Sequence, residues 1–201
     1  MLTLYEQHTS GNCYKVRLLL AHLGRPFRTV EVSARDGTTR KPEFLAMNPI
    51  GRVPTIVLED GRFLAESNAI LLHFAEGTRF LPADAYDRAK AYEWLFFEQY
   101  SHEPAIAVRR ALLTYEERRA RATTERLAQL LASGNQALGV MERRLAEAEW
   151  LAGTSFSVAD ISLYAYTHTA EEGGFSLAPY PGVRRWLARV AAQPGHVPLD
   201  A

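Results

Sequence analysis

The stretch over residues 48–74, NPIGRVPTIVLEDGRFLAESNAILLHF, places the tightest constraint on the fold. Two short runs typical of β-strands, 55–58 and 62–65, flank the pair Asp60-Gly61. This pair predicts a two-residue hairpin turn, in which both central positions have positive φ. Apolar residues then recur with a helical period from Ala69 to Phe74. The stretch therefore predicts a β-hairpin followed directly by a helix.

A strand, a helix and a second strand are expected before this hairpin. Residues 2–5 alternate as a strand does, and residues 13–23 carry apolar side chains at helical spacing before Gly24, a typical C-terminal cap. Residues 27–32 are rich in strand-forming side chains. A strand–helix–strand order favours two parallel strands with a right-handed crossover, that is, a βαβ unit. With the hairpin and its helix, the first 76 residues therefore predict βαβ followed by ββα. This is the order of a thioredoxin-like domain.

The remainder of the chain predicts only helices. Residues 77–86 contain Pro82 and lack a repeating apolar face, so they are expected to form the linker to an all-helical domain over residues 87–201. Helices are expected over 87–115, with a bend at Pro104, and over 123–148 and 183–192. Between the last two, the sequence FSVADI predicts another helix start, with Ser157 and Asp160 as a capping box and therefore a structural Asp160. The predicted fold class is α/β plus all-α.

Composition excludes several classes of partner. The 201 residues include 23 basic and 23 acidic side chains, so the net charge of zero gives no reason to expect nucleic acid or an anionic membrane. No apolar run approaches the roughly 20 residues that span a bilayer, and the first residues do not resemble a signal peptide. The single cysteine excludes an internal disulfide and indicates a reducing cytoplasm. The six histidines lack metal-site spacing, so no metal is predicted.

Two polar side chains stand where the hairpin passes into its helix. The first N–H groups of a helix lack partners within the helix and carry a partial positive charge, so Ser67 and its neighbours can hold a carboxylate. Glu66 beside it can bind an ammonium group. A ligand with both groups at one end is amino-acid-like. The alternative for an isolated Glu-Ser pair is an ordinary helix cap.

The turn TSGNC, residues 9–13, joins the first strand to the first helix. Redox enzymes of the thioredoxin type carry a Cys-x-x-Cys pair here, whereas this chain has Ser10 and Cys13. A dithiol exchange therefore lacks its attacking thiolate. A hydroxyl at the first position suits a different task, which is donating a hydrogen bond to the sulfur of another molecule.

Together, the proline-led hairpin, the Glu-Ser helix start and the segment SGNCYKVRLLLAHLG resemble the glutathione S-transferases, over nearly the whole chain. The match is to the serine-type, bacterial branches, nu-like or theta-like. The resemblance implies a cytoplasmic, homodimeric detoxification enzyme that uses glutathione as substrate and transfers its thiol to small electrophiles. Two alternatives remain open: a glutathione-dependent reductase of peroxides or disulfides, and a non-catalytic binding protein that keeps the fold.

The resemblance also implies roles for particular residues. Ser10 is expected to stabilise the glutathione thiolate, with Asn12 as second candidate and Tyr5 or Cys13 as further alternatives. A better interpretation of Cys13 is a small apolar side chain packed against the sheet.

For the rest of the ligand, the resemblance implies a cis Pro54, with the Val53 main chain pairing with the cysteinyl part of glutathione. Glu66 and Ser67 are expected to hold its γ-glutamyl end. Two basic residues, Lys41 and Arg52, are expected to make further contacts with glutathione. The co-substrate pocket is expected on the long helix, at Tyr100, His102, Ile106 and Arg109. For Arg52, a simply solvated side chain is an equal alternative.

Overall fold

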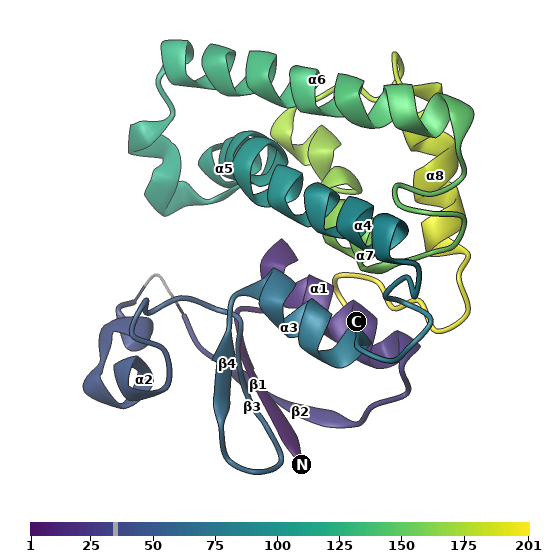
Figure 1. Cartoon of the computed structure of the whole chain (residues 1–201). Helices are drawn as coiled ribbons and strands as arrows, with labels where there is room; N and C mark the ends of the chain where they lie inside the picture. The colour runs from purple at the N-terminus through teal and green to yellow at the C-terminus, as the bar shows by residue number, and fades with distance from the viewer. Residues whose placement is uncertain (34–35) are drawn as a thin grey trace. The chain divides into compact units, whose positions relative to one another are not determined.

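The computed structural model describes residues 1–33 and 36–201, which form two compact units (Figure 1). The first contains residues 1–78 and 194–201, and the second contains residues 79–193. The sequence placed 194–201 with the helical domain, whereas the structure packs these residues in the first unit. The Tyr14 hydroxyl donates a hydrogen bond to the Val197 carbonyl at 2.7 Å, a contact between residues far apart in the chain.

The first unit has a four-stranded sheet with the order β2-β1-β3-β4. β1 and β2 are parallel, while β3 is antiparallel to both of its neighbours. Helices α1 and α3 lie side by side along the sheet (Figure 1). This is a thioredoxin-like domain, as the order of predicted elements indicated. Its elements are β1 (Leu2–Glu6), α1 (Gly11–His22), β2 (Phe27–Glu31), η1 (Thr38–Arg40), α2 (Pro42–Met47), β3 (Thr55–Val57), β4 (Phe63–Ala65) and α3 (Ser67–Ala75).

The turn of the hairpin differs from the prediction. Asp60 does not have positive φ, and only Gly61 does, at 85°. The Gly61 N–H donates to Leu58 O at 3.0 Å, and the Leu58 N–H donates to Arg62 O at 2.8 Å. The loop therefore has three residues and ends in a left-handed glycine, a common alternative to the two-residue turn. The Asp60 carboxylate instead accepts from the Arg62 main chain at 3.0 Å.

The second unit is helical, and the described part of it contains no strand. The single bent helix expected over 87–115 is interrupted by a π-helical turn over Glu98–His102. The next helix begins at Glu103, with Pro104 in its first turn, where the missing N–H of proline costs nothing. The elements are α4 (Ala85–Phe97), η2 (Glu98–His102), α5 (Glu103–Thr114), η3 (Glu116–Arg121), α6 (Thr124–Glu147), α7 (Val158–Thr167), η4 (Ala170–Gly173) and α8 (Pro181–Ala191).

Gly134, which weakens α6 by propensity, has a packing reason. A Cβ at this position would lie 2.3 Å from the Phe175 ring. The helix therefore accepts a cost of about 1 kcal/mol relative to alanine so that a buried aromatic ring can approach its backbone. Gly139, in contrast, has open space where a Cβ would be.

The start of α7 confirms the predicted capping box. The Asp160 carboxylate accepts from the Ser157 main chain at 2.9 Å and from its hydroxyl at 3.1 Å. It also accepts from the Leu151 N–H at 3.0 Å and the Trp186 indole at 2.9 Å. Burial nevertheless raises the pKa of Asp160 to about 6. The residue holds three chain segments together.

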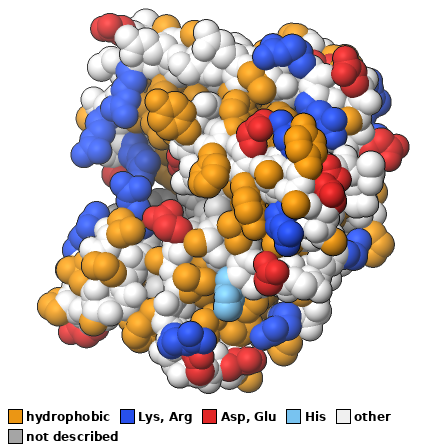
Figure 2. All heavy atoms as spheres, viewed as in Figure 1, with side chains coloured by type: hydrophobic (Ala, Val, Ile, Leu, Met, Phe, Trp, Pro, Cys, Tyr) orange, Lys and Arg blue, Asp and Glu red, His pale blue; other side chains and the backbone are white. Residues whose placement is uncertain are grey.

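Acidic and basic side chains both appear among apolar ones on the face shown in Figure 2, in keeping with the net charge of zero. No helix in the described part of the chain has the length and apolar character needed to cross a membrane.

Candidate functional site

Ser10 is the N-cap of α1. Its backbone is extended, with φ −79° and ψ 124°, and its Oγ accepts from the Cys13 N–H at 3.5 Å. This distance is at the outer limit of a hydrogen bond, so the cap is weak. A serine hydroxyl also has one proton to donate. The half-buried Ser10 side chain therefore has donor capacity beyond its capping bond.

Asn12, in the first turn of α1, is joined to the start of α3. The buried Ser67 hydroxyl donates to Asn12 Oδ1 at 3.2 Å. The Lys15 ammonium lies 3.4 Å from the Ser67 Oγ and 3.5 Å from Asn68 Oδ1. Two segments far apart in the sequence, the SGN turn and the Glu-Ser helix start, are thus side by side.

Glu66 has φ 67° and is the one non-glycine residue with positive φ among those the structure describes. Such a conformation costs about 1–3 kcal/mol and persists where the surroundings impose it, commonly at ligand sites. Here it places Glu66 as the N-cap of α3, with its side chain exposed and its carbonyl accepting from Ile70 N at 2.9 Å. The helix start is therefore not a simple side-chain cap, because Glu66 makes no capping hydrogen bond with its side chain.

The Val53–Pro54 peptide is cis, which confirms this prediction. The β1–β3 ladder ends at Thr55, and no main-chain hydrogen bond between Val53 and another described residue is found. A bound peptide can therefore pair with Val53 as an additional strand does.

Sequence reasoning missed the residue that shapes the loop before this proline. Asn48 is buried, and its amide donates to Arg52 O at 2.8 Å and to Thr55 Oγ1 at 3.0 Å. Its Oδ1 accepts from the Ile50 N–H at 3.0 Å. The available signal was the Asn-Pro pair, because asparagine side chains commonly close turns through the backbone two residues on.

The two basic residues expected near glutathione are both exposed. Lys41 precedes α2 at its N-cap position without a side-chain capping hydrogen bond, and Arg52 lies in the loop that Asn48 holds. The exposure of Arg52 is compatible with its ligand role and with its solvated alternative.

The four expected co-substrate residues have different surroundings. His102 is buried, with Nε2 2.9 Å from Thr167 Oγ1, and Ile106 is buried as well. Arg109 donates to Leu127 O at 3.2 Å and lies over the Phe175 ring. Tyr100 lines an open groove of about 490 Å³ beside Phe97 and Pro104, and the other three residues are not part of its lining. The structure does not gather these residues into one described pocket.

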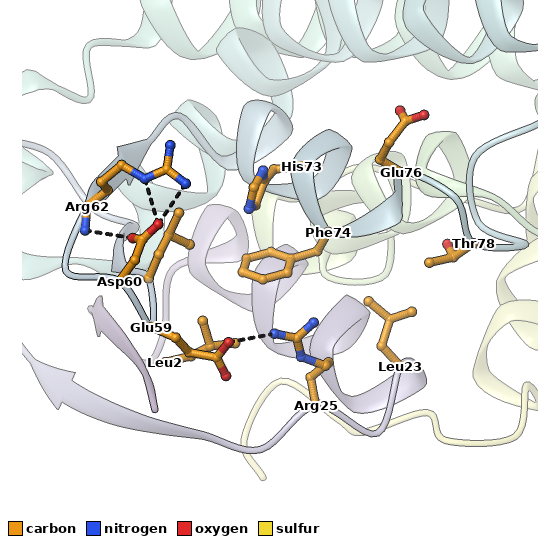
Figure 3. A pocket seen from close by; sticks show the side chains of 11 residues that line it. Leu2, Leu23, Arg25, Glu59, Asp60, Arg62, His73, Phe74, Glu76 and Thr78 are labelled. Carbon is orange, nitrogen blue, oxygen red and sulfur yellow. Dashed lines mark hydrogen bonds and ion pairs between the residues drawn. The ribbon is translucent and has the colours of Figure 1, made fainter.

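A second cavity, of about 510 Å³, lies in the first unit beside α3 and the hairpin (Figure 3). Its rim contains the Arg25–Glu59 and Asp60–Arg62 ion pairs, at 3.6 Å and 2.7 Å, and Phe74 faces into it (Figure 3). None of the predicted site residues lines it. It is therefore separate from the site built on Ser10 and Ser67.

Cys13 is fully buried, and burial raises the pKa of its thiol to about 12. It is therefore a protonated thiol at neutral pH, as expected of a packed apolar side chain. Tyr5 lies in β1 opposite Thr55, with its ring edge-on to Phe44 at a centroid distance of 6.2 Å. Among the described residues, no group of three or more His, Cys, Asp or Glu side chains could hold a metal ion.

Comparisons with known proteins identify the family of the chain. Two family models match: "Glutathione S-transferase, N-terminal domain" over residues 9–76 and "Glutathione S-transferase, C-terminal domain" over residues 98–194. Glutathione S-transferase 3 of Zea mays is 34% identical over 96% of this chain and 90% of its own length. The disulfide-bond oxidoreductase YfcG of Escherichia coli is 29% identical over 96% of this chain and 92% of its own.

Solved structures are similar over the same length. A glutathione S-transferase from Pseudomonas fluorescens superposes with a TM-score of 0.95, at 46% identity and over 98% of both chains. Ure2p in complex with glutathione superposes with a TM-score of 0.87, at 26% identity, over 96% of this chain and 95% of that one. The chain belongs to the glutathione S-transferase family.

Proposed function

We propose that the chain is a glutathione transferase that activates the thiol of glutathione for attack on small electrophiles. The observation that carries the proposal is the Ser67–Asn12 hydrogen bond, 3.2 Å long, which joins the helix start with Glu66 to the turn with Ser10. One end of the joined surface suits an amino-acid-like group, and the other offers a hydroxyl to a sulfur. Glutathione has both groups in one molecule.

In this proposal the γ-glutamyl end binds at the start of α3. The carboxylate accepts from the first N–H groups of the helix, where the helix dipole favours an anion. The exposed Glu66 carboxylate binds the ammonium group. The cysteinyl part pairs with the Val53 main chain beside the cis Pro54, and Lys41 and Arg52 are the proposed partners of the glycyl end.

Ser10 acts on the thiol by favouring its charged form. A free thiol with a pKa near 8.5 is mostly protonated at pH 7, and lowering it by two units requires about 2.7 kcal/mol. A hydrogen bond from Ser10 Oγ to the thiolate contributes about 1.5–3 kcal/mol, and the α1 dipole about 0.3–1 kcal/mol. Asn12 is the second donor, because its amide group also carries protons.

The reaction then needs no protein nucleophile. The thiol proton leaves to solvent, and the sulfur forms a bond to the electrophilic carbon. The leaving group, such as chloride from a chloronitrobenzene, departs with the electrons of its bond. The groove beside Tyr100 is the proposed co-substrate region, while His102 and Ile106, which are buried, support it from behind in this proposal.

A second candidate function is reduction of disulfides, favoured by the 29% identity to YfcG, whose name is disulfide-bond oxidoreductase. Here the glutathione thiolate attacks one sulfur of the disulfide and releases the other as a thiolate. A second glutathione thiolate then attacks the glutathione sulfur of the mixed disulfide, which forms glutathione disulfide and releases the remaining substrate sulfur as a thiolate. Since Cys13 is buried and protonated, bound glutathione supplies the sulfur in this reaction too.

The same proposal includes a cytoplasmic homodimer. Large apolar side chains are exposed in both units: Phe96 by 73% and Tyr100 by 88% in the second, and Phe63 by 48% on the edge strand β4 of the first. Edge strands and exposed apolar side chains favour association with another chain. A sedimentation mass near that of one chain, 22.5 kDa, at micromolar concentration would exclude the dimer.

Glutathione binding is the first experiment. At a concentration of 100 times Kd, a ligand stabilises the folded protein by about 2.7 kcal/mol, so glutathione should raise the Tm measurably. Glu66→Ala should reduce this rise, while Glu59→Ala, an exposed glutamate on the hairpin, should not. Unchanged melting of the wild-type protein in glutathione would contradict the proposal and favour a non-catalytic role.

Rates with a chloronitrobenzene, an organic peroxide and a glutathione mixed disulfide then separate the two enzymes. Conjugation should dominate for the transferase. Turnover of the mixed disulfide alone would assign the reductase.

A further inference from the structure

The turn before Ser10 is held by side chains from outside it. The His8 N–H donates to the Glu31 carboxylate at 3.0 Å, while the His8 carbonyl accepts from Arg17 Nη2 at 3.0 Å. The Ser10 N–H donates to Gln7 O at 2.9 Å. The main chain is therefore fixed on both sides of the peptide units that lead into the α1 cap.

Arg17 is the centre of these contacts. Its guanidinium contacts the Glu6 carboxylate through Nε at 3.4 Å and the His8 ring through Nη1. Both ion-pair side chains are buried, with relative exposures of 7% for Arg17 and 2% for Glu6. A guanidinium directs its donors in a rigid plane, which lysine cannot reproduce.

The same guanidinium also binds the end of the chain. Arg17 Nη2 donates to Leu199 O at 2.7 Å, in addition to His8 O. Two further contacts hold this segment on α1: the Tyr14 hydroxyl to Val197 O at 2.7 Å, and His22 Nδ1 with Pro194 O at 2.9 Å. One buried nitrogen, Arg17 Nη2, therefore donates both to the turn before Ser10 and to the segment 194–201.

From these contacts we infer that Arg17 is a positioning residue for Ser10, and that the C-terminal residues 194–201 help to hold the Arg17 side chain in place. Arg17 fixes the His8 peptide, which sets the direction of the Ser10 hydroxyl toward the bound thiol. Leu199 completes the hydrogen bonds that keep the guanidinium in place. The inference rests on the proposed role of Ser10 in thiol activation.

The test uses the full-length protein with Arg17→Lys, and a chain that ends at Pro198 and so lacks only the Leu199 carbonyl and the residues after it. Arg28→Lys is the matched control, because Arg28 lies in the same unit and donates to Thr3 Oγ1 at 2.8 Å without contacting the turn. Arg17→Lys keeps the positive charge beside Glu6, so the buried carboxylate retains a cation.

Amide hydrogen exchange without glutathione measures whether the turn is held. Peptides that cover residues 7–13 should exchange about tenfold faster in Arg17→Lys, because a charge-assisted hydrogen bond no longer restrains local opening. The shortened chain should show a smaller change in the same direction. Unchanged exchange in Arg17→Lys would overturn the inference.

The pKa of bound glutathione measures the consequence. Arg17→Lys should raise it by about half a unit to one unit, and the shortened chain by less. In a Ser10→Ala background Arg17→Lys should cause no further rise, since residues that act through one another are not additive. If the rises in thiol pKa caused by the two substitutions are additive, Arg17 does not act through Ser10. Faster hydrogen exchange in Arg17→Lys with an unchanged thiol pKa would likewise show that the role of Arg17 is only structural.

The proposed function fails in a different way. If Ser10→Ala itself leaves the thiol pKa unchanged, Ser10 is not the activating group, and the positioning role for it is refuted as well. If glutathione does not bind the wild-type protein, the proposed function is refuted, while hydrogen exchange still decides whether Arg17 holds the turn.

Discussion

Two serine-capped helix starts in this protein use the same residue type for different purposes. Ser157 at α7 is buried, and its partner Asp160 accepts hydrogen bonds from two main-chain N–H groups, a hydroxyl and an indole. Ser10 at α1 is half-buried, caps its helix through a 3.5 Å contact, and has no acidic residue in the first turn. The first start is satisfied within the protein. The second has hydrogen-bonding capacity to offer a ligand.

This difference explains why a capping box is evidence against catalysis. A carboxylate that already accepts four hydrogen bonds in a buried site has nothing left for a substrate, and moving it would leave several donors unpaired. A weakly capped helix start loses little when a ligand arrives.

The largest expected effect is on stability, at the start of α7. Asp160→Ala should lower the free energy of unfolding by about 3–5 kcal/mol, because it leaves buried N–H groups without an acceptor. Ser157→Ala should cost only about 0.5–2 kcal/mol, the usual range for a lost cap. Denaturant unfolding followed by circular dichroism measures both. Equal losses in the two variants would mean that the cap, and not the Asp160 network, carries the stability.

Thiol activation is the next largest effect, at the weakly capped start. Ser10→Ala should raise the pKa of bound glutathione by roughly one to two units, since a hydrogen bond to a charged group contributes about 1.5–3 kcal/mol. Glutathione affinity and protein stability should change little. Titration of thiolate absorbance in the complex gives the pKa, with Ser157→Ala as the control that also loses a cap. An unshifted curve would transfer the role to Asn12.

The pH dependence of stability distinguishes the two starts in another way. Burial raises the pKa of Asp160 from its ordinary value of 3.8 to about 6, so between these values the folded state binds more protons than the unfolded state. The free energy of unfolding should therefore fall as pH rises from about 4 to about 6, and this contribution is constant above that range. Asp160→Asn should lack this fall. Denaturant unfolding of both proteins at several pH values measures it, and parallel curves would show that Asp160 stays ionised.

The sequence predicted the helix start at Ser157 more completely than the helix start at Ser10. Ser157 and Asp160 are close in sequence, so a local pattern was enough to predict their capping box. The predicted strands and helices of the first unit, and the cis Pro54, also lie where expected. Periodicity predicts such elements because it is local in the chain, and the family resemblance adds the cis Pro54 through a short motif.

The parts that could not be predicted depend on main-chain atoms and on contacts between distant residues. Arg17 binds the carbonyls of His8 and Leu199, and a carbonyl has no signature in the sequence. Residues 194–201 have no repeating apolar face, so their packing in the first unit was not visible. The hairpin turn type depended on whether Asp60 would adopt positive φ, which its sequence permits but does not require.

The smallest expected effect is at Cys13, which follows Ser10 in the same turn. Its side chain is fully buried and its thiol, with a pKa of about 12, is not ionised at neutral pH. Cys13→Ala should therefore leave the rates of conjugation and of mixed-disulfide reduction within about twofold, and should lower the free energy of unfolding by about 1 kcal/mol through lost packing. Iodoacetamide should label the native wild-type protein slowly and the unfolded protein quickly. Loss of activity in Cys13→Ala, with full activity in Ser10→Ala, would reverse the comparison of the two helix starts. The protein would then supply the reacting sulfur, and the half-buried Ser10 hydroxyl would be only a helix cap.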